Sequence, residues 1–579
     1  MIICGIKITH DGGIALIENG KLIFSIELEK INNNHRYAGI ADLAEIKSLL
    51  QSKGYRMDQI DLFVVDGWHG SDDNWKGVSH ITVPTDGTEI KIPVAYYNEE
   101  NLADDNTAGQ NYSEGLLIDQ ISYPYQSFRH VTGHILGAYC TSPFSASAED
   151  SYVLVWDGGQ YPRLYYINAA EKTIVNKGPL FFLMGTIYGI MGQYFGPYKK
   201  TAEALAEDRK EMELNGYFGG LSVAGKIMSY IAEGSIDHEL LKELPELYKS
   251  VFEISNLFEH KFCQAIQEFT ADKSCTDADI LLTIHSYLQN LLIQSLSRKI
   301  AADGYAESNF CFCGGSALNI KWNSAIRASG IFKEIYIPPF PNDSGSAIGT
   351  ACAAMWANTD FIALKWNVYS GPSLIESELA ENGWKTEACN LKELAMLLHQ
   401  TEEPVVFLSG CAEIGPRALG NRSLLAIATK NKIKDCLNEV KQREAFRPVA
   451  PICLQEDAAD IFDPGCADPY MLFEHQVQDS WKDRVPAICH LDGSARLQSV
   501  AADSPAHEIR TLLEEYKKIS GIPLLCNTSA NLNGSGFFPD VKSAIQWGKL
   551  NYIWSNHTLY SKVAQLELSS EYEFEEIKL

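Results

Sequence analysis

The sequence predicts a mixed α/β protein whose first part is internally duplicated, and a repeated strand-and-turn pattern supports this. An apolar strand over residues 2–8 runs into Asp11-Gly12-Gly13, and strands over 14–18 and 21–27 flank the hairpin turn Asn19-Gly20. About 146 residues later, a strand over 151–157 ends in Asp157-Gly158-Gly159, and another strand follows over 163–167. Asp-Gly also occurs in ordinary turns, but paired glycines beside a carboxylate let backbone amides approach a phosphate. The repeat therefore favours two similar nucleotide-binding lobes.

Two such lobes are typical of actin-like ATPases and of acetate and sugar kinases, and the intervening sequence fits an α/β fold. We expect a helix over 41–53, a buried strand over 60–65 and a loop or variable insertion over 67–111, which is polar and aperiodic. Helical periodicity dominates 237–303, a strand is expected over 309–313, and a helix of small residues over 347–356. The acidic segment 567–576 is expected to be a solvated end.

Length and composition indicate the class of protein. A chain of 579 residues is too long for one hydrophobic core, and 46% apolar with 21% charged residues is usual for a folded protein. The net charge of −26 argues against a nucleic-acid partner. Fourteen scattered cysteines without a CxxC pair indicate neither a zinc knuckle nor a disulfide framework. No signal peptide and no apolar run of eighteen residues are present, so we expect a cytoplasmic protein without a membrane partner.

Basic and polar residues are concentrated in short turns between residues 404 and 531. A buried strand over 404–410 precedes a Gly/Pro-punctuated turn that carries Arg417 and Arg422. The later segments add Lys441, Arg447, Arg496, Asn527 and Ser529. A single arginine is most simply a solvated surface charge, but guanidinium forks bind phosphate and carboxylate oxygens bidentately. Such a concentration in an acidic chain predicts a pocket for a polyanionic small molecule.

These turns also carry a family resemblance. GPRALGNRS, KQREAFRPVAP, HLDGSARLQ and LLCNTSAN, in this order, resemble the C-terminal half of the nodulation-type O-carbamoyltransferases, the family that includes antibiotic carbamoyltransferases of the tobramycin type. The resemblance implies an actin-like N-terminal domain over 1–359, similar to the tRNA threonylcarbamoyl transferase. It further implies a linker over 360–372 and a YrdC-like α/β domain over 373–579.

The resemblance implies a two-step reaction. The C-terminal domain would make carbamoyl adenylate from carbamoyl phosphate and Mg-ATP, and the N-terminal domain would transfer the carbamoyl group to a hydroxyl of a small natural product. The residues implied to bind the two anionic substrates are Arg417, Arg422, Lys441, Arg447, Arg496, Asn527 and Ser529, with Arg417, Lys441 and Arg447 as catalytic groups.

His130 and His134 are spaced i and i+4 in a predicted helix, which brings both imidazoles to one face. Two histidines alone are an incomplete metal site and are structural at least as often. The resemblance supplies Asp157 and Asp343 as further ligands. This set suits a divalent first-row metal, with Fe(II) expected and Mn or Zn as substitutes. His10 is the candidate general base for the acceptor hydroxyl, because imidazole titrates near working pH.

Two further segments match nucleotide-site motifs of the family. Lys226 lies in a GKxM segment, although a surface lysine is nearly as good an interpretation. Gly314, Gly315 and Asn319 lie in a GGxALN segment that would form an anion cradle at the start of a helix. The segment 27–30, Glu-Leu-Glu-Lys, departs from the family's acidic run ending in arginine, as does Gly12-Gly13 after the first aspartate. These departures leave the acceptor open.

Two other functions remain open at this stage. One is an ATP-dependent phosphotransferase on the same N-terminal fold, against which the arginine-rich second domain argues. The other is a non-catalytic nucleotide-binding regulator. A monomer and a homodimer are both compatible with the sequence.

Overall fold

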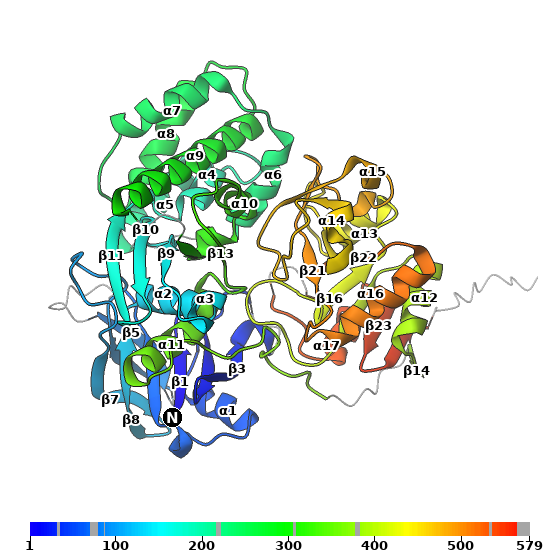
Figure 1. Cartoon of the computed structure of the whole chain (residues 1–579), viewed down its shortest axis with the longest axis horizontal. Helices are drawn as coiled ribbons and strands as arrows, with labels where there is room; N and C mark the ends of the chain where they lie inside the picture. The colour runs from blue at the N-terminus through cyan, green and yellow to red at the C-terminus, as the bar shows by residue number, and fades with distance from the viewer. Residues whose placement is uncertain are drawn as a thin grey trace, which may run out of the picture.

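The computed structural model describes residues 1–563 except for 32–34, 70–78, 86, 216–219, 221, 305–307, 377–382 and 532–534. Figure 1 shows two stacked sheet-containing lobes, coloured blue to green, beside a third body coloured yellow to red. The expected acidic end at 567–576 lies outside the described residues. No helix in the described part is long and apolar enough to cross a membrane.

The first two lobes repeat one strand order. The first sheet runs β3-β2-β1-β4-β8-β7 and the second runs β11-β10-β9-β12-β13. The bounds are β1 Ile2–Lys7, β2 Gly13–Glu18, β3 Lys21–Glu27, β4 Leu62–Asp66, β7 Gln110–Ile118, β8 Ile121–Phe128, β9 Ser151–Val155, β10 Arg163–Asn168, β11 Thr173–Pro179, β12 Asn309–Cys313 and β13 Ile335–Tyr336. In the first lobe β1 pairs antiparallel with β2 and parallel with β4. In the second lobe β9 pairs in the same way with β10 and β12. The predicted duplication is confirmed.

Two helices fill the space between these sheets. Helix α11 (Ser346–Asn358) contacts β1, β2 and β4, while α2 (His130–Cys140) contacts β9 and β12. Every residue of α2 is buried, as expected for a helix packed on all sides. The two helices cross closely, because a Cβ built on Gly349 would lie 2.1 Å from the carbonyl oxygen of Gly133. This crossing fixes α2, and with it His130 and His134, between the lobes.

A helical region follows β11 and confirms the periodicity over 237–303. Its helices are α4 Ile187–Tyr194, α5 Ala202–Asn215, α6 Ala224–Tyr230, α7 His238–Ser250, α8 Phe258–Thr270 and α9 Asp277–Asp303. Thr276 and Asp279 form a capping box at the start of α9, and Gly304 ends it with a φ of 74°. Helix α10 (Ile320–Ala328) follows β12 and faces the third body.

The third body contains a mixed eight-stranded sheet in the order β14-β24-β23-β15-β16-β22-β17-β21. Its strands are β14 Trp384–Ala388, β15 Val405–Leu408, β16 Arg422–Ala426, β17 Ala450–Leu454, β21 Gln498–Val500, β22 Leu524–Ser529, β23 Tyr552–Ser555 and β24 Thr558–Lys562. The helices of this body are α12 Leu391–Thr401, α13 Lys432–Val440, α14 Ala458–Ile461, α15 Asp479–Lys482, α16 His507–Ser520 and α17 Val541–Trp547. Three short strands, β18 Phe462–Asp463, β19 His475–Val477 and β20 Ser494–Ala495, form a separate small sheet. The predicted α/β class, with a duplicated first part and a separate second α/β part, is confirmed.

Two segments differ from a simple loop or linker. The stretch 67–111 was expected to be a loop or a variable insertion. The loop is wrong for its described part: β5 (Ser79–Thr85) and β6 (Thr88–Val94) form an antiparallel hairpin, and β7 begins at Gln110. Buried Ile81 and Val83 alternate with exposed neighbours, but the flanking polar residues obscured that period. The segment 360–372 lies along β3, since Leu22 and Ser25 donate backbone hydrogen bonds to it at 2.9 and 2.8 Å. Two short helices complete the first part, α1 (Ala44–Ser52) and α3 (Pro143–Ala146).

The close crossing of α2 and α11 makes Gly349 sensitive to added volume. We expect Gly349→Ala to lower the free energy of unfolding by about 1–3 kcal/mol, because the methyl group must displace the Gly133 backbone. Gly225→Ala is the matched control: its Cβ would meet nothing within 4 Å in a helix, so it should be neutral or stabilise by up to ~1 kcal/mol. Equal unfolding midpoints for the two variants in urea would contradict the described crossing.

Candidate functional site

Four side chains predicted as metal ligands meet between the two lobes. His130 and His134 come from α2, Asp157 follows β9, and Asp343 precedes α11. Each offers one ligand atom, and these atoms all lie within 4.8 Å of one another. The Nε2 atoms of both histidines lie 3.4 Å from Oδ1 of Asp343 and 3.1 Å from each other. The structure therefore brings the four residues together in a buried group that is able to hold a metal ion.

The orientation of His130 supports metal binding. Its Nδ1 lies 2.7 Å from Oδ2 of Asp66, which accepts the hydrogen on that nitrogen, and Nε2 is directed at His134 and Asp343. A carboxylate behind a ligating histidine is the usual second partner of metal-bound imidazoles. Lys7 lies 3.0 Å from Oδ2 of Asp66 and 2.9 Å from Oδ2 of Asp343 and neutralises part of the acidic charge. The donor set fits a divalent cation of the first transition row.

Electrostatic coupling within this group is strong. Burial opposes protonation of His130, but nearby carboxylates, Asp66 first, outweigh it and raise the pKa of His130 to about 9. Burial also opposes ionisation of Asp343, yet Lys7, His130 and His10 hold the pKa of Asp343 well below its usual range. Burial and the positive charge of His130 lower the pKa of His69 to about 4. A metal at this site would therefore take the place of a proton on His130.

Three members of this centre were not among the predicted residues. Asp66 ends β4 as Asp66-Gly67, which repeats the strand–Asp–Gly pattern seen at Asp11 and Asp157, so a signal for it existed. Lys7 ends β1, and Tyr97 donates its hydroxyl to Oδ2 of Asp157. Nothing in the local sequence distinguished Lys7 or Tyr97 from other strand and loop residues.

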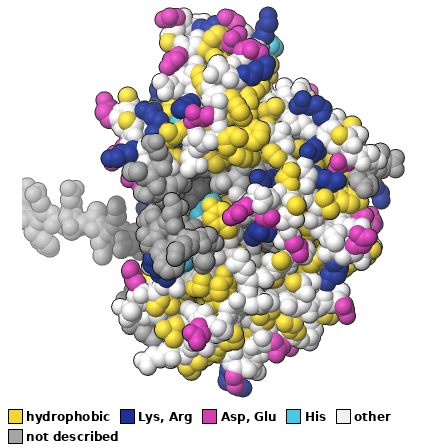
Figure 2. Space-filling view, turned by 90° about the vertical axis from the view of Figure 1, so that its left-hand side faces the viewer, with side chains coloured by type: hydrophobic (Ala, Val, Ile, Leu, Met, Phe, Trp, Pro, Cys, Tyr) yellow, Lys and Arg dark blue, Asp and Glu magenta, His cyan; other side chains and the backbone are white. Residues whose placement is uncertain are grey.

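His10 lies at the edge of the metal-ligand group. Its Nε2 is 3.5 Å from Oδ2 of Asp343, and its Nδ1 is 2.9 Å from Oδ2 of Asp11. Although burial disfavours the charged imidazole, the carboxylates of Asp343 and Asp11 raise the pKa of His10. Figure 2 shows a hollow on the face formed by the two lobes, with histidine side chains visible at it. His10 is thus close enough to the ligand group to serve a bound acceptor.

The predicted nucleotide residues are divided between two places. Gly314 and Gly315 follow β12, and the N–H of Gly315 donates to Oδ1 of Asp157 at 2.8 Å, so this amide supports the metal-ligand group. Asn319 caps α10 by accepting from the N–H of Trp322 at 3.2 Å. Lys226 lies elsewhere, with its ammonium 4.8 Å from the ring centre of Tyr198, beside the third body. An open anion cradle at Gly314-Gly315 remains a prediction.

The third body contains a cluster of half-buried cations, which we call the arginine cluster: Arg417, Arg443, Arg447 and Arg496. Burial and the neighbouring positive charges lower the pKa of Arg417 far below its usual range, that of Arg496 to about 10 and that of Arg443 to about 9. Within the described residues, Nε of Arg417, Nε of Arg496 and Nη2 of Arg443 are buried without a hydrogen-bond partner. Such unpaired guanidinium groups need an anion, as a substrate phosphate would supply.

Arg422 does not share this environment. It is 1% exposed, and its guanidinium donates to the backbone carbonyls of Ser409, Gly410, Pro372 and its neighbour Asn421. It therefore closes the turn that presents Arg417. The predicted contact of Arg422 with a substrate anion has no support in this geometry, because the guanidinium faces the backbone.

Buried Glu413 shapes the same turn. Its Oε1 accepts hydrogen bonds from the backbone N–H groups of Leu419 and Asn421 at 2.7 Å and of Arg422 at 3.2 Å. Three donors converging on one carboxylate oxygen fold the chain between residues 413 and 422 into a fixed loop. Arg417 lies at the middle of this loop.

Lys441, Asn527 and Ser529 bound the arginine cluster. Lys441 donates to the carbonyl oxygens of Ser529 and Asn531, each at 2.7 Å, and burial and Arg443 lower its pKa strongly. Asn527 donates to Oε1 of Gln498 at 2.9 Å, while its own Oδ1 is buried with no partner among the described residues. These groups hold β22 in place beside the cluster, and Asn527 keeps an acceptor free.

A further cation, Arg36, approaches the arginine cluster from the first lobe. The charge of Arg36 lowers the pKa values of Arg417, Lys441 and Arg447, although burial is the larger cause for each. Sequence analysis missed Arg36 because the family motifs lie elsewhere, and it missed Arg443 although that residue lies inside one of them.

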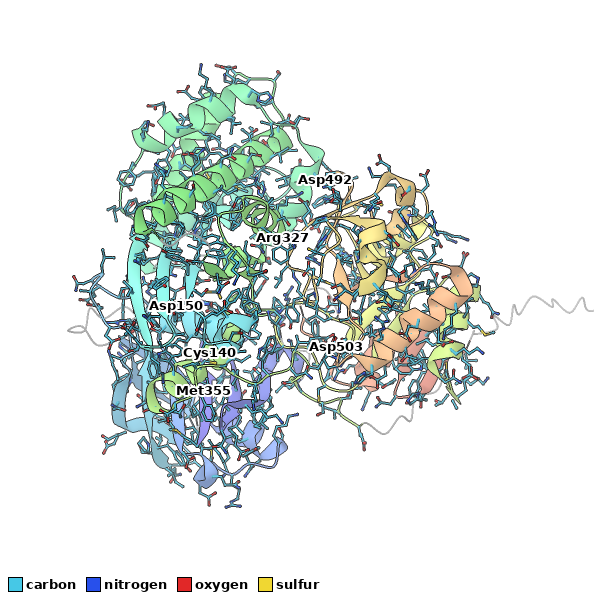
Figure 3. The ribbon with its side chains drawn as sticks, in the orientation of Figure 1. Cys140, Asp150, Arg327, Met355, Asp492 and Asp503 are labelled. Atoms are coloured by element: carbon cyan, nitrogen blue, oxygen red, sulfur yellow. The ribbon has the colours of Figure 1, made fainter. Side chains whose placement is uncertain are left out.

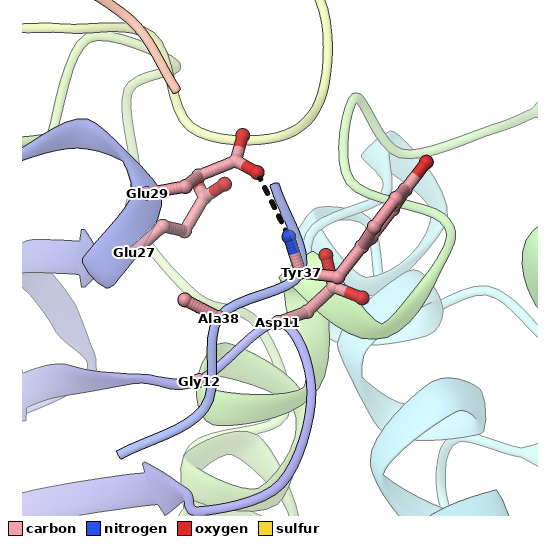
Figure 4. Close-up of a pocket in the computed structure, with 6 residues that line it drawn as sticks. All are labelled: Asp11, Gly12, Glu27, Glu29, Tyr37 and Ala38. Atoms are coloured by element: carbon pink, nitrogen blue, oxygen red, sulfur yellow. Dashed lines mark hydrogen bonds between the residues drawn. The ribbon is translucent and has the colours of Figure 1, made fainter. Parts of the chain in front are cut away.

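An acidic pocket lies beside these cations on the first lobe. Asp11, Glu27 and Glu29 line it together with Gly12, Tyr37 and Ala38, as Figure 4 shows. The backbone N–H of Tyr37 donates to Oε2 of Glu29 at 3.4 Å, which orders the segment that carries Arg36. Asp11 in this lining contacts His10 beside the metal-ligand group, and the charges of Arg36 and Arg417 act on Tyr37 in the same lining.

Two family models of known proteins match this chain, one in each of its two parts. Residues 2–352 match the family model described as the carbamoyltransferase N-terminus, and residues 395–562 match that of the carbamoyltransferase C-terminus. The chain belongs to the carbamoyltransferase family. The predicted enzyme class is therefore confirmed.

Relatives of this carbamoyltransferase match it along its whole length. Nodulation protein U of Rhizobium tropici is 44% identical over 98% of this chain and 97% of its own. The 3'-hydroxymethylcephem-O-carbamoyltransferase of Streptomyces clavuligerus is 28% identical over 97% of this chain and 100% of its own. The solved activator of the 2-hydroxyisocaproyl-CoA dehydratase from Clostridium difficile aligns at a TM-score of 0.30 and 13% identity over 61% of this chain and 94% of its own.

The contact between Asp66 and His130 predicts a role in metal affinity. We expect Asp66→Asn to weaken binding of Fe(II) or Mn(II) by about 10–100-fold, because the amide no longer fixes the tautomer of His130. Anaerobic calorimetry of the purified protein measures this. Asp58→Asn, at an exposed position, is the control and should leave affinity unchanged. Equal affinities for both variants would contradict the role of Asp66.

The two arginines of the Gly/Pro turn should respond oppositely to replacement. Arg422→Met leaves several backbone carbonyls without donors and should lower the free energy of unfolding by roughly 3 kcal/mol. Arg417→Met removes a half-buried charge that is repelled by its neighbours, so stability should stay equal or rise. Urea unfolding of both variants tests this, and a comparable loss in Arg417→Met would show that Arg417 is structural.

Proposed function

We propose that this carbamoyltransferase acts on a hydroxyl group in two steps. In the first, carbamoyl phosphate, ATP and water give carbamoyl adenylate, phosphate and pyrophosphate. In the second, the acceptor hydroxyl attacks the carbamoyl carbon, AMP leaves, and the hydroxyl proton passes to a base. The observation that carries the proposal is the presence of two separate charge groups, one cationic around Arg417 and one of histidines and carboxylates around Asp343.

The arginine cluster suits the first step. Adenylate formation brings a carboxylate-like anion against the α-phosphorus of ATP, and both reactants repel each other until their charge is neutralised. Arg417, Arg443 and Arg496 offer buried N–H groups that already lack partners in the described chain, so they need no rearrangement to receive phosphate oxygens. Asn527 and Lys441 would bind and orient the same substrates from β22 and the end of α13.

The metal-ligand group suits the second step. His130, His134, Asp157 and Asp343 would hold the metal, which we expect to be Fe(II), and a metal bound there supplies Lewis acidity toward a carbonyl oxygen. His10 would accept the proton of the acceptor hydroxyl at Nε2, and Asp11 would stabilise the resulting imidazolium through Nδ1. Lys7 keeps Asp343 ionised and therefore able to act as a ligand.

A small acceptor with a hydroxyl group is favoured. The cephem relative is named for a hydroxymethyl acceptor, which has a hydroxyl of this kind. We extend this class of acceptor, and the ATP-dependent activation, to the present chain as part of the proposal. The acceptor would bind beside His10 and the metal-ligand group.

A pyrophosphate assay without acceptor tests the first step. The unaltered protein should release pyrophosphate from ATP only when carbamoyl phosphate is present. Arg447→Ala should reduce this rate by about 100-fold or more, because it removes a cation from the arginine cluster. His130→Ala should retain it, and so should the control Arg484→Ala, whose guanidinium lies exposed over Trp481.

Other outcomes of this assay distinguish the remaining functions. Conversion of ATP to ADP without any requirement for carbamoyl phosphate would indicate a phosphotransferase. Nucleotide binding without turnover would indicate a regulator. Either result would contradict the two-step reaction.

A further inference from the structure

An unpaired amide lies next to the metal-ligand group and has no role in the mechanism above. Gln160 is the third residue after Asp157, and its backbone N–H donates to the carbonyl of Asp157 at 3.2 Å. Its side chain is 5% exposed, and both Nε2 and Oε1 are buried without a hydrogen-bond partner in the part of the chain that the structure describes. A buried amide with neither its donor nor its acceptor used is unfavourable unless a ligand or a bound water pairs with it.

The turn that carries Gln160 is held rigidly. The N–H of Gly185 donates to the carbonyl of Asp157 at 2.9 Å, and the N–H of Met184 donates to the buried carboxylate of Glu259 at 2.6 Å. Thr186, in the same segment, also has a buried hydroxyl without a partner among the described residues. The two segments therefore form one wall that offers several unused polar atoms.

This wall borders the metal-ligand group. Asp157, at the start of the turn, is one of the four ligands and accepts the hydroxyl hydrogen of Tyr97. A Cβ on Gly159 would lie 3.1 Å from Nε2 of His69 and 3.3 Å from the ring of Tyr97, so the turn packs against the aromatic side of the centre. Gln160 follows the ligand Asp157 by three residues in this turn, and its backbone is hydrogen-bonded to that of Asp157.

The chemistry of the transferred group matches this amide. A carbamoyl group ends in a primary amide, with a carbonyl acceptor and an N–H donor side by side. The side chain of Gln160 presents the complementary donor and acceptor, so two parallel hydrogen bonds are possible. An acetyl group or a carboxylate lacks the N–H and can form only one of them.

We propose that Gln160 binds the carbamoyl group of the activated intermediate through this amide pair and selects it against other acyl groups. Nε2 donates to the carbamoyl oxygen, and the carbamoyl N–H donates to Oε1. This inference rests on the proposed function, since only the two-step reaction brings a carbamoyl adenylate to this centre. It adds a specificity residue that neither the metal-ligand group nor the arginine cluster provides.

A binding experiment with stable analogues tests the pair. Adenosine 5'-(carbamoylmethyl)phosphonate keeps the terminal amide, and the matching acetonylphosphonate ester replaces the amine by a methyl group. Calorimetry is carried out on two full-length variants, Arg447→Ala alone and Arg447→Ala combined with Gln160→Met. Arg447→Ala weakens binding of the analogues at the arginine cluster. We expect about tenfold preference for the carbamoyl analogue when Gln160 is present and no preference in the Gln160→Met variant.

Asn106 offers a matched control. Its side-chain amide is also buried, with both polar atoms unpaired in the described chain. The backbone carbonyl of Asn106 accepts a hydrogen bond from the hydroxyl of Thr132 at 2.9 Å. Asn106→Leu should leave the preference for the carbamoyl analogue unchanged. Gln160→Met should not lower the melting temperature, since it removes an unpaired polar group. A merely structural role for Gln160 would lower it.

The outcomes separate this inference from the proposed function. The amide pair would be overturned if Gln160→Met kept the preference for the carbamoyl analogue or lost affinity for both analogues equally. It would also be overturned if the protein with Gln160 showed no preference between the analogues. The two-step reaction is tested separately by carbamoyl-phosphate-dependent pyrophosphate release from the unaltered protein. Absence of this release would contradict the two-step reaction, whatever the analogues show.

Discussion

Repulsion among the clustered arginines is the constraint on which this molecule depends. The positive charges of Arg447 and Arg496 add to burial in lowering the pKa values of Arg417 and Arg443. Some of the guanidinium N–H groups are buried without a partner in the described chain. Folding must therefore supply the free energy that holds them together, through the loop built on Glu413 and the backbone contacts of Arg422. An anion that carries several negative charges would therefore stabilise this site most when it binds.

The first lobe contributes to that constraint directly. Lys30 donates to the carbonyl oxygens of Glu413 and Gly415 at 2.5 and 2.7 Å, and Glu27 accepts from the N–H of Gly415 at 2.8 Å. Helix α10 makes a second contact, where Lys321 pairs with Asp492 at 2.8 Å; Figure 3 labels Arg327 of the same helix and Asp492 near the boundary of the two parts. These contacts fix the arginine-bearing turn against the lobe that holds the metal-ligand group.

Much of the fold was readable in the sequence because its signals are local. Apolar strands ending in Asp-Gly at 11 and 157 gave the duplication, and the i, i+4 spacing of His130 and His134 gave a shared helix face. The β5–β6 hairpin was missed because polar residues obscure its alternation.

The site was only partly predictable because its residues meet through tertiary structure. Asp343 was placed beside the histidines by family resemblance, whereas Asp66, Lys7 and Arg36 join from strands and loops whose sequences do not reveal their partners. Arg422 shows the opposite case: its motif suggested an anion ligand, but its surroundings are backbone carbonyls. Glu27 and Lys30, at the two ends of the segment that departs from the family pattern, form the contact with the Gly415 turn.

The most direct test of the account is a crystal structure of the protein with α,β-methylene ATP, which cannot release pyrophosphate. The account predicts that triphosphate oxygens lie within hydrogen-bond distance of Arg417, Arg443 and Arg496, while Arg422 keeps its backbone contacts. Triphosphate bound only at Gly314 and Gly315, with the arginine cluster free of anion, would contradict the assignment of the first step to the third body.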